Sequence, residues 1–189
     1  MQINELWKKL INYRQIREPE LKKYPIKGAT VDEINKLEEK LSIQLPESFK
    51  QSLMISNGEI ELNENEDLST WFGDWNILLN CEEIFNITEE YRKIYTEGVK
   101  FDYSYEIKNK TLEWANEFIV FLSNNCDYYA VLDMREGDQK GQVLAVDIEG
   151  GILAYWANSY EEWFKMAVDE VFEYGELRLE TIEKKLHII

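Results

Sequence analysis

Apolar residues in the first part of the chain recur at the three- and four-residue spacing of an amphipathic helix. This spacing predicts a helix over residues 2–15. A second helix is predicted to begin at Thr30, where Glu33 completes a capping box. Pro46 suits the first position of a third helix, which Asn57-Gly58 is expected to end. The apolar positions that define these three helices are Ile3, Leu6, Trp7, Leu10, Ile11, Ile34, Leu37, Leu41, Phe49, Leu53 and Met54.

The pattern changes in the second part of the chain to short runs rich in β-branched and aromatic residues. A short strand at 77–79 and a helix at 81–97 are predicted first, and residues 98–116 fit no clear pattern. Four strands are then predicted at Phe118–Leu122, Tyr128–Met134, Gln142–Ile148 and Ile152–Trp156. The short turns between these four strands indicate antiparallel neighbours, because a parallel crossover needs a dozen or more residues.

A last helix is predicted after the strands. Ser159 and Glu162 have the spacing of a second capping box, and an apolar face runs from Tyr160 to Phe172. The predicted fold class is α+β, with N-terminal helices, an antiparallel β meander and a packed C-terminal helix. We expect one domain over 1–189, made of an N-terminal helix and loop (1–27), a helix pair (28–58), a sheet with an inserted helix (76–156) and a C-terminal helix (159–186).

Composition places the chain among globular proteins. Of its 189 residues 44% are hydrophobic and 13% aromatic, values that exclude the disordered class. No apolar run approaches the roughly 20 residues of a membrane span, and the first residues lack the pattern of a secretory signal. Cys81 and Cys126 have no paired spacing. We therefore expect a cytoplasmic protein with reduced thiols that does not contact a membrane.

Charge is distributed unevenly along the chain. The formal net charge is -16, yet residues 1–28 contain seven Lys or Arg and three Asp or Glu, a net of +4. The remaining residues therefore carry -20. Such a field repels nucleic acid and attracts basic partners. The alternative is that the charge serves solubility alone.

The sequence contains no recognisable catalytic pattern. The single histidine, His187, lies three residues from the end, so a Ser-His-Asp or Cys-His arrangement is not expected. No glycine-rich phosphate loop is present. Asp127, Asp133, Asp138 and Asp147 lie in or near the predicted meander but lack the spacing of a calcium loop. We predict no catalytic residue, no cofactor and no metal site, although 37 acidic residues leave a carboxylate-based enzyme as a minor alternative.

One segment combines acidic and aromatic residues without any lysine or arginine. Aromatic anchors beside carboxylates could bind a basic partner. The competing interpretation is that the aromatic residues belong to the core and the acids to an exposed loop. The candidate partner-binding residues are Glu59, Glu61, Glu64, Glu66, Asp67, Trp71, Asp74 and Trp75.

The helix pair also carries a pattern that resembles a known family. It consists of Gly28-Ala29-Thr30, Ile34, Leu37-Glu38, Leu41, Leu45-Pro46, Phe49-Lys50 and Asn57-Gly58. This pattern resembles the opening of the SUKH superfamily, which includes the fungal cell-wall-synthesis regulator. The later strands and the Ser159 helix resemble the family more loosely, so the resemblance covers roughly residues 28–172.

The resemblance implies a binding protein. Bacterial members of the superfamily are typically immunity proteins that neutralise a cognate toxin, often a nuclease, and they supply no catalytic residues to transfer. The leading hypothesis is therefore a bacterial immunity protein that binds a basic toxin domain. The alternative is a regulatory scaffold that binds a host partner, and the carboxylate-based enzyme ranks third. The sequence does not identify the oligomeric state.

Overall fold

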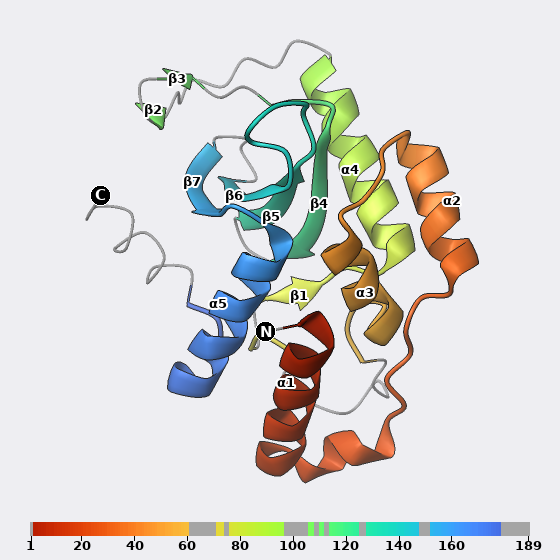
Figure 1. The fold of residues 1–189 in the computed structure, drawn as a ribbon, viewed down its shortest axis with the longest axis vertical. Coiled ribbons are helices and arrows are strands. Elements are labelled where there is room, and N and C mark those ends of the chain that lie inside the picture. Colours follow the sequence, from red (N-terminus) through yellow and green to blue (C-terminus); the bar gives the residue numbers. More distant parts are fainter. Residues whose placement is uncertain are drawn as a thin grey trace.

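The computed structural model describes residues 2–60, 71–73, 76–96, 106–107, 110–111, 114–124, 128–147 and 152–178. Helices precede a five-stranded sheet and a final helix packs against it (Figure 1), which confirms the predicted α+β class. The elements are α1 (Ile3–Arg17), the short 3₁₀ helix η1 (Pro19–Lys23), α2 (Val31–Leu41), α3 (Glu47–Ile55), β1 (Ile77–Leu78), α4 (Cys81–Thr96), β2 (Glu106–Ile107), β3 (Lys110–Thr111), β4 (Phe118–Ser123), β5 (Tyr128–Asp133), β6 (Gln142–Asp147), β7 (Ile152–Ala157) and α5 (Tyr160–Tyr174).

The sheet is antiparallel throughout, with the strand order β1-β4-β5-β6-β7. The predicted meander therefore forms β4 to β7, and β1 adds to the free edge of β4. Phe118–Leu122 are buried at every position. Because consecutive side chains of a strand point to opposite faces, β4 is covered on both sides. The two short strands β2 and β3 form a separate pair in the segment that the sequence left unassigned.

The helices enclose the sheet through aromatic contacts and one edge contact. The ring of Phe121 on β4 packs against Phe49 of α3 and against Tyr160 and Trp163 of α5. The Thr88 hydroxyl of α4 accepts a hydrogen bond from the Val120 N–H at 3.1 Å. Helix α4 thus covers the part of the β4 edge that short β1 leaves open, where unpaired backbone groups would otherwise be exposed.

The two predicted caps differ in the structure. At α2 the capping box is complete, because the Thr30 hydroxyl accepts from Glu33 N–H and the Glu33 carboxylate accepts from Thr30 N–H. At α5 only half of the predicted box forms. Ser159 accepts from Glu162 N–H, but the Glu162 carboxylate accepts from the backbone and side chain of Asn158 instead. Asn158 offers a side-chain amide donor besides its backbone N–H, so the Glu162 carboxylate binds Asn158 in place of Ser159 N–H.

Three other details differ from the predictions. Pro46 is the N-cap of α3 rather than its first helical residue. The side chains of Met54 and Phe172 retain 42% and 38% exposure although they belong to predicted apolar faces. Helix α5 ends at Tyr174 instead of continuing to 186, because Gly175 adopts a left-handed conformation with φ of 89° and its N–H bonds to Val171 O.

None of the helices among the described residues combines the length and apolarity that a membrane span requires. His187 and Cys126 lie outside the described residues.

Candidate functional site

The acidic and aromatic segment begins at the half-buried carboxylate of Glu59. Glu59 Oε2 accepts a hydrogen bond from Trp71 N–H at 2.9 Å, and Oε1 accepts from Leu78 N–H at 2.7 Å. Burial raises the pKa of Glu59 to about 7, against the lowering influence of these two donors and of Arg14. Glu59 therefore joins the start of the segment to Trp71 at its return and to the first residues of the sheet.

Trp71 is a core residue. Its side chain is 2% exposed, and its ring meets that of Trp7 edge-on with centroids 5.2 Å apart. The indole N–H donates to Ser56 Oγ at 3.1 Å. This matches the competing interpretation, in which the aromatic residues are internal. The other candidate partner-binding residues lie outside the described residues: Glu61, Glu64, Glu66, Asp67, Asp74 and Trp75.

A buried arginine also binds Trp71. Arg14 of α1 is 3% exposed, and its Nε donates to the backbone oxygen of Trp71 at 3.1 Å. Burial lowers the pKa of Arg14, while Glu18, whose carboxylate lies 3.4 Å from Nη1, opposes that shift. Sequence reasoning did not single out Arg14. The helical spacing could have predicted the burial of Arg14, since it lies four residues after Leu10 on the apolar face of the helix.

A groove of about 760 Å³ lies between α2, α4 and the chain that precedes α2. Lys36 and Lys40 come from α2, and Glu82 and Phe85 come from α4; Lys40 Nζ lies 4.6 Å from the centre of the Phe85 ring. The mixture of cations, carboxylates and apolar groups suits the polar surface of a protein rather than a purely anionic ligand. The groove is lined by Pro25, Lys27, Gly28, Glu33, Lys36, Leu37, Lys40, Asn57, Glu59, Asn80, Cys81, Glu82 and Phe85.

The thiol in this groove is not set up as a nucleophile. Cys81 is the first residue of α4, and its N–H donates to Asn57 Oδ1 at 2.9 Å. Burial, and to a smaller extent the charge of Glu33, raises the pKa of the Cys81 thiol to about 11. Reactive cysteines have a lowered pKa, since the thiolate is the reacting form. The Cys81 thiol is free.

The buried carboxylate at the end of β5 is paired with an arginine. Asp133 is 1% exposed, and its two oxygens accept from Arg135 Nε at 2.9 Å and Nη2 at 2.6 Å. The pairing raises the pKa of Arg135, whose guanidinium also lies 5.0 Å from the Phe118 ring centre. Within the part of the chain that the structure describes, no three His, Cys, Asp or Glu side chains gather as a metal-binding group.

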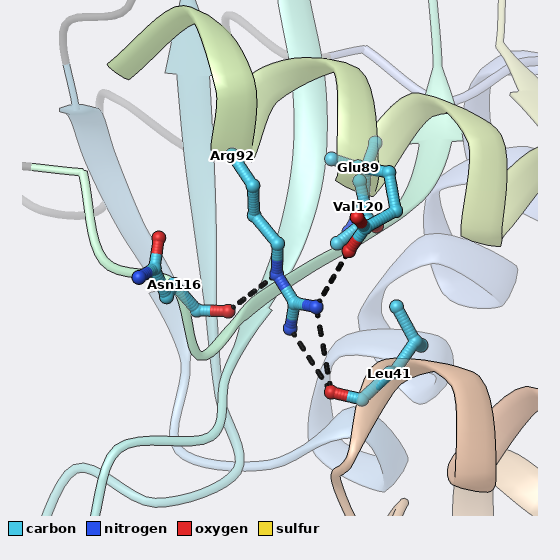
Figure 2. Close-up of polar contacts among 6 residues, drawn as sticks. Leu41, Glu89, Arg92, Asn116 and Val120 are labelled. Carbon is cyan, nitrogen blue, oxygen red and sulfur yellow. Dashed lines mark hydrogen bonds and ion pairs between the residues drawn. The ribbon is translucent and has the colours of Figure 1, made fainter. Parts of the chain in front are cut away.

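Arg92 of α4 binds two neighbouring segments, away from the lining of the groove (Figure 2). Its Nε donates to Asn116 O at 2.7 Å, and both terminal nitrogens lie 3.4 Å from Leu41 O. Nη1 also pairs with Glu89 at 2.8 Å. One guanidinium thus joins α4 to the end of α2 and to the chain that enters β4. The helices that flank the groove are held in a fixed relation.

Comparison with known proteins places this arrangement in a family. The family model described as SMI1 / KNR4 family (SUKH-1) matches residues 28–166. This chain belongs to the SMI1/KNR4 family. The membership confirms the resemblance drawn from the helix-pair pattern. The match begins at Gly28 and ends within α5, so α1 and the last turns of α5 lie outside the SMI1/KNR4 region.

One curated relative is the "Glucan synthesis regulatory protein" of Neurospora crassa. It is 32% identical to this chain over 91 residues, which is 48% of this chain and 16% of the relative. The chain therefore matches less than a fifth of that protein's length. The SMI1/KNR4 family generally contains immunity or regulatory proteins without enzymatic activity.

Proposed function

We propose that this member of the SMI1/KNR4 family is an immunity protein that binds and neutralises a basic toxin domain of the nuclease type. The observation that carries the proposal is the formal charge of -16 for the chain, with -20 on residues 29–189. A nuclease holds phosphates with lysine and arginine side chains. An acidic protein can cover that face, and opposite fields accelerate its capture.

The acidic segment supplies the docking contacts in this proposal. Glu59 and Trp71 contribute indirectly, because the hydrogen bond between them brings the two ends of the segment together. The contacts themselves come from the remaining candidates, which are Glu61, Glu64, Glu66, Asp67, Asp74 and Trp75. Acids on the exposed faces of α4 and α5 add to the same negative field; they include Glu82, Glu83, Glu90, Glu161, Glu162 and Asp169.

Co-expression with the product of the adjacent gene tests the proposal. We expect that product to arrest growth, this chain to restore growth, and the two proteins to co-purify. Association measured by stopped flow should slow steeply as salt rises, since the attraction is between exposed charges. A harmless neighbour, or a toxic neighbour that this chain neither binds nor neutralises, would contradict the proposal.

The location of the docking contacts is tested with matched variants. Glu61, Glu64 and Glu66 are changed to Gln and Asp67 to Asn, which removes four negative charges from the segment. The control removes four from exposed positions elsewhere, by changing Glu39, Glu90 and Glu117 to Gln and Asp138 to Asn. The segment variant should associate at least tenfold more slowly than the control. Equal rates would locate the contacts outside the segment.

A regulatory scaffold is the second candidate, and the Neurospora crassa relative favours it, since that protein is named for the regulation of glucan synthesis. Under this alternative the neighbouring product is not toxic, and the chain binds a protein of the cell-wall or signalling machinery. A carboxylate-based enzyme receives less support, because the carboxylates of Glu59 and Asp133 are both held by structural donors.

A further inference from the structure

Helices α1 and α5 lie side by side and run in the same direction (Figure 1). Trp7 contacts Phe164 near their beginnings, with ring centroids 5.1 Å apart. Tyr13 contacts Phe172 near their ends, with centroids 4.9 Å apart. The C-terminal turns of the two helices therefore meet at one end of the molecule.

Large apolar side chains are exposed at this end. Ile16 is 67% exposed, and Phe172 and Tyr174 are 38% and 39% exposed. Tyr13 connects Ile16 and Phe172, because it touches Phe172 and lies on the same helical face as Ile16, three residues further along. We refer to Tyr13, Ile16, Arg17 and Phe172 as the α1/α5 patch. Contiguous apolar side chains on a surface are typical of protein interfaces.

Arginine side chains border the same aromatic rings. Arg17 Nη1 donates to the Tyr13 hydroxyl at 3.2 Å, and its guanidinium carbon lies 5.5 Å from the Tyr13 ring centre. The Arg178 guanidinium lies 4.7 Å from the Tyr174 ring centre. Tyrosine and arginine are residue types that dominate binding energy in interfaces. The α1/α5 patch therefore has the composition of a binding surface.

The two helices differ in the sign of their exposed charges. On α1 the exposed charged residues are Glu5, Lys8, Lys9 and Arg17, a net of +2. On α5 and the three residues that follow Gly175 the charged residues that reach solvent are Glu161, Glu162, Lys165, Asp169, Glu173, Glu176 and Arg178, a net of -3. The α1 half of the surface is thus basic and the α5 half acidic. A two-fold axis through the patch exchanges the halves, so α1 of each copy meets α5 of the other.

We propose that the chain forms a two-fold symmetric homodimer across the α1/α5 patch. The exposed rings pack at the centre, and the basic and acidic halves pair around them. A second copy of the chain presents its acidic α5 half to the basic α1 half of the first copy, and its basic half to the acidic one. A foreign partner would need the same two-part charge pattern. The patch lies outside residues 28–166, so the dimer would belong to this chain's additions to the family region.

Crossed charge variants test this proposal by sedimentation equilibrium over micromolar to near-millimolar concentration. The wild-type chain should sediment as a dimer. Lys9→Glu with Arg17→Glu makes both halves acidic, and Glu173→Lys with Glu176→Lys changes the net charge of the α5 half from -3 to +1, so that both halves are basic. Each double variant should lose at least tenfold in dimer affinity by itself, while an equal mixture of the two should form a heterodimer.

Matched controls carry the same charge changes away from the patch. Lys36→Glu with Lys93→Glu, and Glu39→Lys with Glu90→Lys, should remain dimeric, because these residues are exposed on α2 and α4. Circular dichroism confirms that every variant is folded. A monomeric wild-type chain, patch variants that dimerise as tightly as the controls, or a mixture that fails to form heterodimers would each overturn the proposal.

Discussion

The carboxylate of Glu59 and the backbone nitrogen of Trp71 lie 2.9 Å apart, although twelve residues separate them in the chain. The second oxygen of the same carboxylate reaches Leu78, at the start of the sheet. Trp71 in turn accepts a hydrogen bond from Arg14 on α1. One acidic side chain therefore connects the helix pair, the segment that follows it and the sheet, which makes it a sensitive point for mutation.

Replacing Glu59 with Gln should destabilise the fold by about 1–3 kcal/mol at pH 5. The amide keeps one acceptor oxygen but turns its NH₂ group toward a backbone donor, so one buried N–H loses its partner. Urea unfolding monitored by tryptophan fluorescence measures the change. The exposed Glu39→Gln variant is the control and should stay within about 0.5 kcal/mol of the wild type.

The free energies of unfolding of the wild type and of Glu59→Gln should depend differently on pH. Glu59 has a pKa of about 7 in the fold and about 4.5 when unfolded. Its contribution is fully present below pH 4.5 and is lost as pH rises through 7, because the folded chain then keeps a buried charge. The wild type should therefore lose up to about 3 kcal/mol relative to Glu59→Gln between pH 4.5 and 8. Parallel stability curves for the two proteins would contradict this assignment.

Ser52 should be unusually costly to truncate. Its hydroxyl oxygen accepts from Trp7 Nε1 and from the Tyr160 hydroxyl, each at 2.7 Å. Ser52→Ala leaves two buried donors without an acceptor, and we expect a loss of about 2–4 kcal/mol in the free energy of unfolding. Ser48→Ala on the same helix is the comparison and should change stability by less than about 0.5 kcal/mol. Similar losses in both variants would refute the role given to Ser52.

Gly28 should tolerate no side chain. A β-carbon there would collide with the backbone carbonyl of Met54, and the neighbouring bond from Ala29 N–H to Leu53 O, at 2.8 Å, keeps the two segments close. Gly28→Ala should cost more than about 3 kcal/mol. Gly141→Ala should cost about 1–2 kcal/mol, because a β-carbon there meets open space and the left-handed φ of 87° is the sole source of strain. Thermal unfolding ranks the two, and a reversed order would exclude the steric explanation.

Cys81 should react slowly with alkylating reagents. Its raised pKa of about 11 leaves little thiolate at neutral pH. In a Cys126→Ser background, iodoacetamide labelling followed by mass spectrometry should be at least tenfold slower at pH 7.5 than for an exposed model thiol, and should accelerate up to pH 10. Labelling as fast as the model thiol would show an accessible and activated cysteine instead.

The course of the backbone could be predicted well from periodicity. The predicted strand Phe118–Leu122 became Phe118–Ser123, and the box at Thr30 formed as the spacing required. These features depend on neighbours within a few residues. The reciprocal bond of Glu162 could not be predicted in the same way, since Asn158 offers a competing donor whose advantage depends on the local turn.

The partners of the interior polar residues could not be predicted from local patterns. Glu59 was predicted to face a partner, but its burial depends on Leu78, 19 residues away. Arg14 meets Trp71 at a separation of 57 residues. Local composition ranks both side chains as surface residues, and only the tertiary fold brings their partners together.

Helix α1 lies outside the SMI1/KNR4 match but inside the cooperative unit. Trp7 is buried against Trp71 and Phe164 and donates to Ser52. A chain trimmed to start at Gly28 would uncover those rings and leave Arg14's acceptor without its donor. Limits drawn from family comparison therefore do not coincide with the smallest piece that can fold, and expression of this protein for interaction screens should retain residues 2–27.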